Sequence, residues 1–149
     1  MTTRFDAIVV GTGQAGPALA ARLGSAGLKV AVLECGGGWI GHWMDRMNEF
    51  LESYHWAAAP MSLRPDEYFR RQCWISFDPG ERTVGALGPL CGADRFIWAS
   101  DFPHSDAKYP GVVEELREHN SSLPDDARAG FYGTNALALY GMTAPTLAR

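Results

Sequence analysis

The stretch Phe96-Ile97-Trp98-Ala99-Ser100-Asp101-Phe102-Pro103-His104 carries the clearest structural signal in the sequence. An apolar run, expected to form a buried β-strand over residues 95–99, ends there in a carboxylate, a proline and a histidine. In α/β proteins, ligands and catalytic groups collect at the carboxyl ends of parallel strands. Asp101 and His104 are therefore the candidate catalytic residues.

The composition is that of an ordinary globular domain. The chain has 149 residues, 46% of them hydrophobic, and a formal net charge of −4, so one compact core is possible. It contains no apolar run of membrane-spanning length, no signal-peptide pattern and no cluster of Lys and Arg, which argues against membrane and nucleic-acid partners. The three cysteines, Cys35, Cys73 and Cys91, are too widely spaced for a disulfide framework, so we expect a cytoplasmic protein.

The first part of the chain has the pattern of a βαβ unit. A strand is expected over residues 6–10, a helix over 18–26, and a second strand over 28–33 that ends on Glu34. A G-x-G-x-x-G motif, with Gly11, Gly13 and Gly16, lies between the first strand and the helix. In a dinucleotide site these glycines form the tight turn, admit the pyrophosphate and allow close packing, and the acidic residue binds the ribose. The alternative is a plain βαβ unit whose glycines serve packing.

This segment, residues 1–34, resembles the amino-terminal FAD-binding segment of the pyridine nucleotide-disulfide oxidoreductases. The resemblance implies FAD as a cofactor, with Gly11, Gly13, Gly16 and Glu34 as its binding residues. Members of that family carry a C-x-x-x-x-C motif after the acidic residue, whereas Cys35 is followed here by Gly36-Gly37-Gly38-Trp39-Ile40. The disulfide chemistry of the family is therefore not implied.

Further helices and strands alternate along the rest of the chain. A helix with one buried face is expected from its apolar positions, which are Ile40, Trp43, Met44, Met47, Phe50, Leu51 and Tyr54. Another begins at Pro65, and a buried strand follows over residues 73–77. Helices are expected over residues 82–90, from Pro110 onward, and over 124–140. The alternation predicts about four βα units.

Residues 34–142 resemble the carboxyl-terminal part of an amidohydrolase-related metal-dependent hydrolase. The resemblance is carried by residues 34–40, 65–71, 74–77, 92–104 and 133–141, in this order. It implies a (β/α)₈ barrel that hydrolyses or decarboxylates a small-molecule substrate with a divalent metal, commonly zinc. Asp101 matches the strand-eight aspartate that ligates the metal or takes a proton from metal-bound water, and His104 matches a histidine with a substrate-facing or structural role.

The sequence departs from that family in its histidines. The family takes further metal ligands from an H-x-H motif and from histidines on two other strands, but this chain has only His42, His55, His104 and His119. Zinc requires three or four convergent ligands. We therefore expect a truncated or chimeric copy that is inactive by itself.

Together these patterns predict an α/β fold with about four βα units. The expected form is an open parallel sheet or a partial (β/α)₈ barrel with a Rossmann-like βαβ at its amino terminus. The expected domains are a dinucleotide-binding-like segment over residues 1–34 and a barrel fragment over 35–149. Exposed sheet edges would favour a homo-oligomer.

Two other functions stay open from the sequence. The chain is either a fragment of an FAD- or NAD-binding oxidoreductase or a non-catalytic α/β module. A nucleophilic triad of Ser100, Asp101 and His104 is disfavoured, because residues so close along one loop rarely adopt triad geometry and no G-x-S-x-G motif is present.

Overall fold

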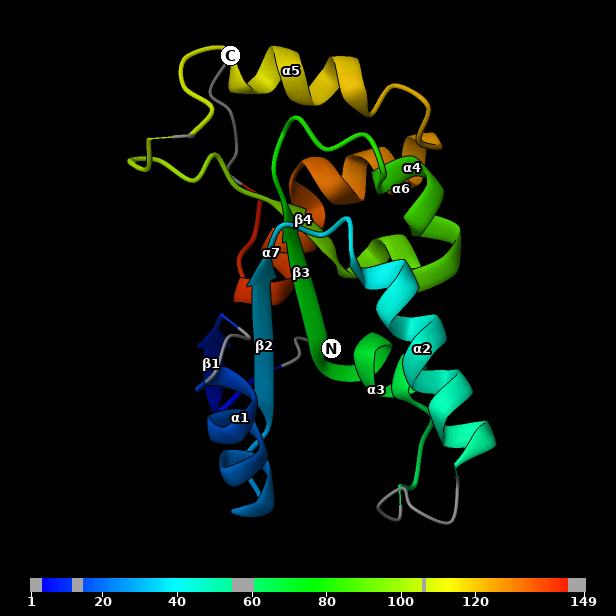
Figure 1. Ribbon diagram of the computed structural model, residues 1–149. Helices are drawn as coiled ribbons and strands as arrows, with labels where there is room; N and C mark the ends of the chain where they lie inside the picture. The colour runs from blue at the N-terminus through cyan, green and yellow to red at the C-terminus, as the bar shows by residue number, and fades with distance from the viewer. Residues whose placement is uncertain (1–3, 12–14, 55–60, 106, 145–149) are drawn as a thin grey trace.

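The structure is a computed structural model that describes residues 4–11, 15–54, 61–105 and 107–144, except for the side chains of Glu34 and Cys35. Four strands form one parallel sheet in the order β1-β2-β3-β4 (Figure 1). They are β1 (Ala7–Val10), β2 (Val30–Cys35), β3 (Cys73–Phe77) and β4 (Phe96–Trp98). The predicted α/β class is confirmed.

The order of the strands in the sheet follows their order in the sequence. This is the arrangement of a sector of a (β/α)₈ barrel, in which each strand pairs with the next one along the chain. A doubly wound sheet instead reverses its strand order at the crevice where nucleotides bind. The described strands contain no such reversal, so the sheet is a partial barrel.

Helices follow every strand of the sheet. They are α1 (Gly16–Ser25), α2 (Ile40–Ser53), α3 (Pro65–Gln72), α4 (Val84–Leu87), α5 (Val112–His119), α6 (Asp125–Ala129) and α7 (Asn135–Tyr140). Three shorter turns are the π-helical η1 (Gly88–Gly92) and η3 (Gly130–Thr134) and the 3₁₀-helical η2 (Ala93–Arg95). The predicted strand over 73–77 is confirmed to the residue.

The last predicted helix is interrupted. The expected helix over 124–140 is divided into α6, η3 and α7, and Gly133 within η3 has a non-helical backbone with φ 176°. The interruption redirects the chain, and α7 packs on the opposite face of the sheet from α2 and α3 (Figure 1).

Both faces of the sheet are covered by apolar side chains. On one face Ile75, Phe77 and Phe96 join α2, α3 and α5 in the larger core, where the rings of Phe77 and Phe96 lie 4.7 Å apart. On the other face Leu139 of α7 packs against the residues of a smaller cluster. That cluster consists of Ala31, Leu33, Trp74 and Ile97. Alternate residues of each strand supply the two faces, as the period of a β-strand requires.

The predicted buried face of α2 is wrong for much of the helix. Ile40 and Met44 are buried, but Trp43 is 54% exposed and Phe50 is 50% exposed. The cause is tertiary, because α2 packs against α3 and η1 rather than along a strand. Its apolar stripe is therefore wider than the surface that covers it.

Candidate functional site

The candidate site lies at the carboxyl ends of the four strands. Because the strands are parallel, the segments that follow them all leave the same edge of the sheet. The described parts of this rim are residues 36–39 after β2, 78–83 after β3, and 99–105 and 107–111 after β4, together with Gly11 and Ala15 after β1. The rim is thus the place where side chains from different strands can converge.

Asp101 and His104 are in contact on the segment after β4. The distance between Asp101 Oδ2 and His104 Nδ1 is 2.9 Å, and the two side chains are 41% and 70% exposed. The backbone N–H of His104 also donates to the carbonyl oxygen of Asp101 at 2.9 Å. The structure therefore brings the two predicted catalytic residues together in a solvent-accessible pair.

The backbone around this pair has an unusual conformation. Asp101 has φ 60°, the left-handed region that non-glycine residues rarely adopt, and the Phe102–Pro103 peptide bond is cis. A non-glycine residue in the left-handed region, as Asp101 is, is found most often at functional sites. Here the N–H of Lys108 donates to the carbonyl of Ser100 at 3.0 Å and closes the loop.

Ser100 does not complete a nucleophilic triad with this pair. The Ser100 hydroxyl oxygen accepts a hydrogen bond from the backbone N–H of Phe102 at 3.4 Å. Among the described contacts, none joins the Ser100 hydroxyl to Nε2 of His104, the ring nitrogen on the far side of the imidazole from Asp101. Activation of a serine would require that contact.

Glu81 holds two segments of the rim together, a role that the sequence reading missed. Its carboxylate accepts backbone N–H bonds from Gly37 at 3.1 Å, Gly38 at 2.8 Å and Asp78 at 2.9 Å. The first two donors follow β2 and the third follows β3. Glu81 is therefore a positioning residue for the rim, and its only sequence signal is its place directly after the Asp78-Pro79-Gly80 turn.

Gly37 brings the segment after β2 close to the core. A Cβ atom at this position would lie 2.2 Å from the Phe77 ring, so only glycine fits here without a rearrangement. Gly36, the preceding residue, has φ 72°. Together the two glycines let the backbone turn over Phe77 and present its N–H groups to Glu81.

Two of the predicted cofactor glycines, Gly11 and Gly16, have local reasons in the structure: a positive φ at Gly11 and close packing at Gly16. Gly11 has φ 91°, and its N–H donates to the carbonyl of Leu33 at 2.7 Å. A Cβ atom on Gly16 would lie 1.9 Å from the Gly11 carbonyl oxygen. Gly13 lies outside the described residues. The sequence predicts that the second strand ends on Glu34, but β2 continues through Cys35, and Glu34 lies in register with Ile75.

The described side chains do not form a complete metal site. Among them, no group of three or more His, Cys, Asp and Glu residues converges on one point. Asp101 and His104 offer two donors, and zinc sites in proteins require three or four ligands. The donor set that the structure shows does not fit a divalent metal by itself.

No helix in the described parts of the chain combines the length and the hydropathy that crossing a bilayer requires.

Solved structures with a similar fold are amidohydrolases and decarboxylases. An amidohydrolase from Mycobacterium avium subsp. paratuberculosis K-10 is 16% identical over 76% of this chain and 28% of its own, with a TM-score of 0.62. A dihydroxybenzoic acid decarboxylase from Polaromonas sp. JS666, with bound manganese and the inhibitor 2-nitroresorcinol, is 18% identical over 75% of this chain and 34% of its own, with a TM-score of 0.56. A 2,6-dihydroxybenzoate decarboxylase from Rhizobium is 21% identical over 86% of this chain and 41% of its own, with a TM-score of 0.56.

The chain spans between 28% and 41% of the length of these three proteins. No curated protein sequence matches it. A model of the amidohydrolase family, however, matches residues 17–142, which is most of the chain and includes β2 and all of α1 except Gly16. By this match the chain belongs to the amidohydrolase family.

Proposed function

We propose that the chain is an amidohydrolase-related hydrolase or decarboxylase of a small molecule in which Asp101 and His104 form the acid–base pair. The observation that carries the proposal is the 2.9 Å contact between these side chains at the carboxyl end of β4. Hydrolysis requires a base that removes a proton from water, and decarboxylation requires an acid that protonates the carbon left by CO₂. A carboxylate hydrogen-bonded to an imidazole can serve either purpose.

The proposal also includes the state of the isolated chain, which we expect to be inactive. A divalent metal in this family would use Asp101 as a ligand, but the described residues add only His104 beside it. Removing the proton from water is far harder without a metal that lowers the pKa of that water. The chain thus supplies the strand-eight part of the site and lacks described partners for it.

The pairing of Asp101 with His104 can be tested without turnover. The ring nitrogen resonances of His104 are recorded by NMR at one fixed pH, in the wild type and in Asp101→Asn. We expect the Nδ1 resonance to change in the variant, because the carboxylate that lies 2.9 Å from this nitrogen is replaced by an amide. Asp126→Asn, a change of the same kind on the exposed surface of α6, is the control. Equal Nδ1 resonances in the wild type and in Asp101→Asn would refute the pair.

Turnover is measured separately, with 2,6-dihydroxybenzoate as the probe because two structural relatives are decarboxylases of this compound class. We expect no release of CO₂ above the buffer rate from the isolated chain, with or without added Mn²⁺ or Zn²⁺. Release that Asp101→Asn abolishes would overturn the expected inactivity and support the role of Asp101. Release that is unchanged in Asp101→Asn would overturn that role.

A flavin-binding function is the second candidate, and one observation favours it. The segment β1-α1-β2 is a parallel βαβ unit in which Gly11 has the positive φ of a tight turn. This candidate assumes that residues 1–34 come from a flavoprotein and were fused to the barrel fragment that follows. The match to the amidohydrolase family begins earlier, at residue 17. Visible flavin absorbance of the purified chain would support binding of FAD. Long-read sequencing across the codons for Val30 to Gly38 tests the fusion.

A further inference from the structure

A cavity lies between the sheet and the helices α2 and α3. Its volume is about 850 Å³, and its walls come from α2, α3, the start of α1 and the strands β2 and β3. Trp39, Trp43, Met47, Met61, Tyr68 and Cys73 are among the side chains that line it. None of the described residues 99–105 and 107–111 lines it, so the cavity is separate from the Asp101–His104 pair.

The described residues that line this cavity carry no charge. Its described side chains are aromatic, aliphatic or sulfur-containing, apart from the phenol of Tyr68. Burial raises the pKa of the Cys73 thiol to about 11, so this group is neutral at physiological pH. The Tyr68 hydroxyl lies 3.0 Å from the hydroxyl of Ser62, which satisfies part of its hydrogen-bonding capacity.

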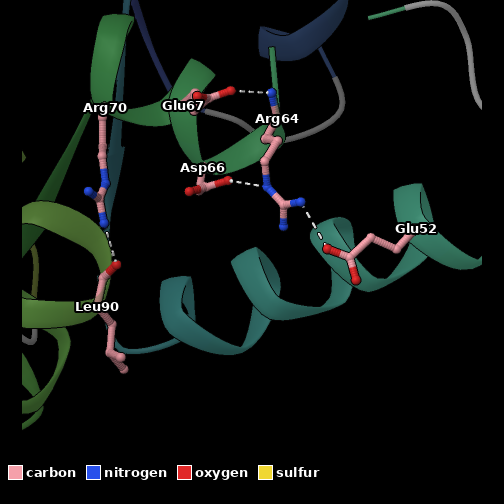
Figure 2. A network of polar contacts seen from close by, with 6 residues as sticks. All are labelled: Glu52, Arg64, Asp66, Glu67, Arg70 and Leu90. Carbon is pink, nitrogen blue, oxygen red and sulfur yellow. Dashed lines mark hydrogen bonds and ion pairs between the residues drawn. The ribbon is translucent and has the colours of Figure 1, made fainter.

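Polar contacts outside the cavity fix the positions of two of its walls (Figure 2). Arg64, at the start of α3, lies 2.9 Å from Glu52 of α2 and 3.5 Å from Asp66. On the other side of α3, Arg70 donates to the carbonyl of Leu90 in η1 at 2.8 Å. The helix α3 is therefore fastened to α2 and to η1, and the space between α2 and α3 is already formed in the structure.

Trp39, Trp43 and Met61 lie at the mouth of the cavity. They are 42%, 54% and 44% exposed, which is unusual for large apolar side chains grouped at one site. Pockets for small molecules have volumes of roughly 300–1,000 Å³ and are mostly apolar, largely pre-formed and rich in aromatic side chains. Methionine adds surfaces that adapt to the shape of a ligand.

We propose that this cavity is a binding site for an uncharged aromatic small molecule. The ring of the ligand would enter between Trp39 and Trp43 and lie against the methionines of α2 and of the segment before α3. An anion is disfavoured, because a buried charge without a partner is costly and no described lining residue is cationic. The proposal does not depend on the reaction at Asp101.

The test uses phenylnaphthylamine, an uncharged fluorescent probe, and anilinonaphthalene sulfonate, its anionic relative. We expect the fluorescence of the uncharged probe to increase and saturate at one probe per chain, with the anion binding about tenfold more weakly or worse. Met47→Trp fills the cavity and should weaken binding by about tenfold or more. Trp43→Ala, which removes an aromatic wall, should also weaken it.

Phe50→Ala is the matched control for Trp43→Ala. Phe50 lies on the same helix and is similarly exposed, but it does not line the cavity. We expect this variant to bind the probe as the wild type does, and circular dichroism and thermal midpoints verify that each variant is folded. Equal effects of Trp43→Ala and Phe50→Ala, or fluorescence that does not saturate, would overturn the proposal. The proposal would also be overturned if the probe fails to bind and sedimentation shows that Trp43→Ala dissociates a dimer. The exposed aromatic residues at the mouth of the cavity would then form a contact between two copies of the chain.

Discussion

Two single side chains, Glu81 and Cys73, affect the stability of the chain through different interactions. The Glu81 carboxylate stabilises the rim because its two oxygens accept three backbone N–H groups from two strand ends. Cys73, at the start of β3, stays protonated because it is buried. Each residue leads to a prediction about stability that can be checked in the isolated chain.

Replacement of Glu81 by alanine is expected to lower the free energy of unfolding by about 2–3 kcal/mol. Hydrogen bonds to a charged acceptor contribute roughly 1.5–3 kcal/mol each, and water will replace part of the loss at this partly exposed site. Glu81→Gln keeps one carbonyl acceptor and should lose less. Urea denaturation measures both variants, with Glu114→Ala on the exposed surface of α5 as the control. A loss no larger than that of Glu114→Ala would show that Glu81 does not hold the rim.

The raised pKa of the Cys73 thiol predicts that the free energy of unfolding falls in alkaline solution. Its pKa is raised to about 11 in the folded chain, from 9.0, by burial. Between these values the unfolded chain releases the proton and the folded chain keeps it, so stability falls as the pH rises. At ~1.36 kcal/mol per pKa unit the full loss is about 2.7 kcal/mol, of which about 2 kcal/mol has occurred by about pH 11.

Denaturant unfolding of the wild type and of Cys73→Ala at about pH 8 and pH 11 isolates this effect. The stability difference between the two proteins at the lower pH reports lost packing, and we expect it to change by about 2 kcal/mol at the higher pH. A constant difference would mean that Cys73 does not titrate in this range. Other titrating groups cancel, because both proteins contain them.

Glycines have different purposes in different elements of the chain. Gly37 follows β2 and has no room for a Cβ atom, which would lie 2.2 Å from the Phe77 ring. Gly24 lies near the end of α1, and a Cβ atom there would meet nothing within 4 Å. The sequence alone does not distinguish these two positions, because both are glycines in short runs of small residues.

The two alanine substitutions should therefore have opposite signs. Gly37→Ala is expected to destabilise the chain by about 1–3 kcal/mol, since the buried ring of Phe77 must move. Gly24→Ala is expected to stabilise it by roughly 0.5–1 kcal/mol through helix propensity. Thermal and urea unfolding of the pair decide the matter. Destabilisation of similar size in both variants would show that the close approach of Gly37 to Phe77 is not what requires glycine.

The whole molecule is an open sheet with β1 at one edge. Val10 on this edge is 71% exposed and Ile8 is 43% exposed, and β1 pairs with β2 alone among the described strands. Exposed apolar edge strands offer unpaired backbone groups to a second chain. The edge is the basis for the homo-oligomer that we propose.

Val10→Lys is expected to weaken self-association by about tenfold or more, because a charge on an edge strand opposes pairing. Sedimentation velocity over a range of protein concentrations measures the effect. Leu19→Lys on α1 is the control, since Leu19 is also half exposed but lies on a helix. Association that is absent from the wild type, or equal in both variants, would contradict a contact through β1.

The sequence by itself determined the alternation of strands and helices, the limits of β3 and the nearness of Asp101 to His104. These features follow from local signals: the apolar runs, the turn residues and a separation of three positions along one loop. Local signals also located the G-x-G-x-x-G turn, although they did not separate cofactor binding from packing.

Only the tertiary structure decided what each surface contacts. The sequential strand order, the break at Gly133, the clamp made by Glu81 and the exposure of Trp43 depend on residues that are distant in the chain. The period of a helix shows that it has an apolar face, but not how much of that face a neighbour covers. The cavity beside α2 likewise has no sequence pattern. It is formed by side chains of α2, α3, β2 and β3, which come together only in the folded chain.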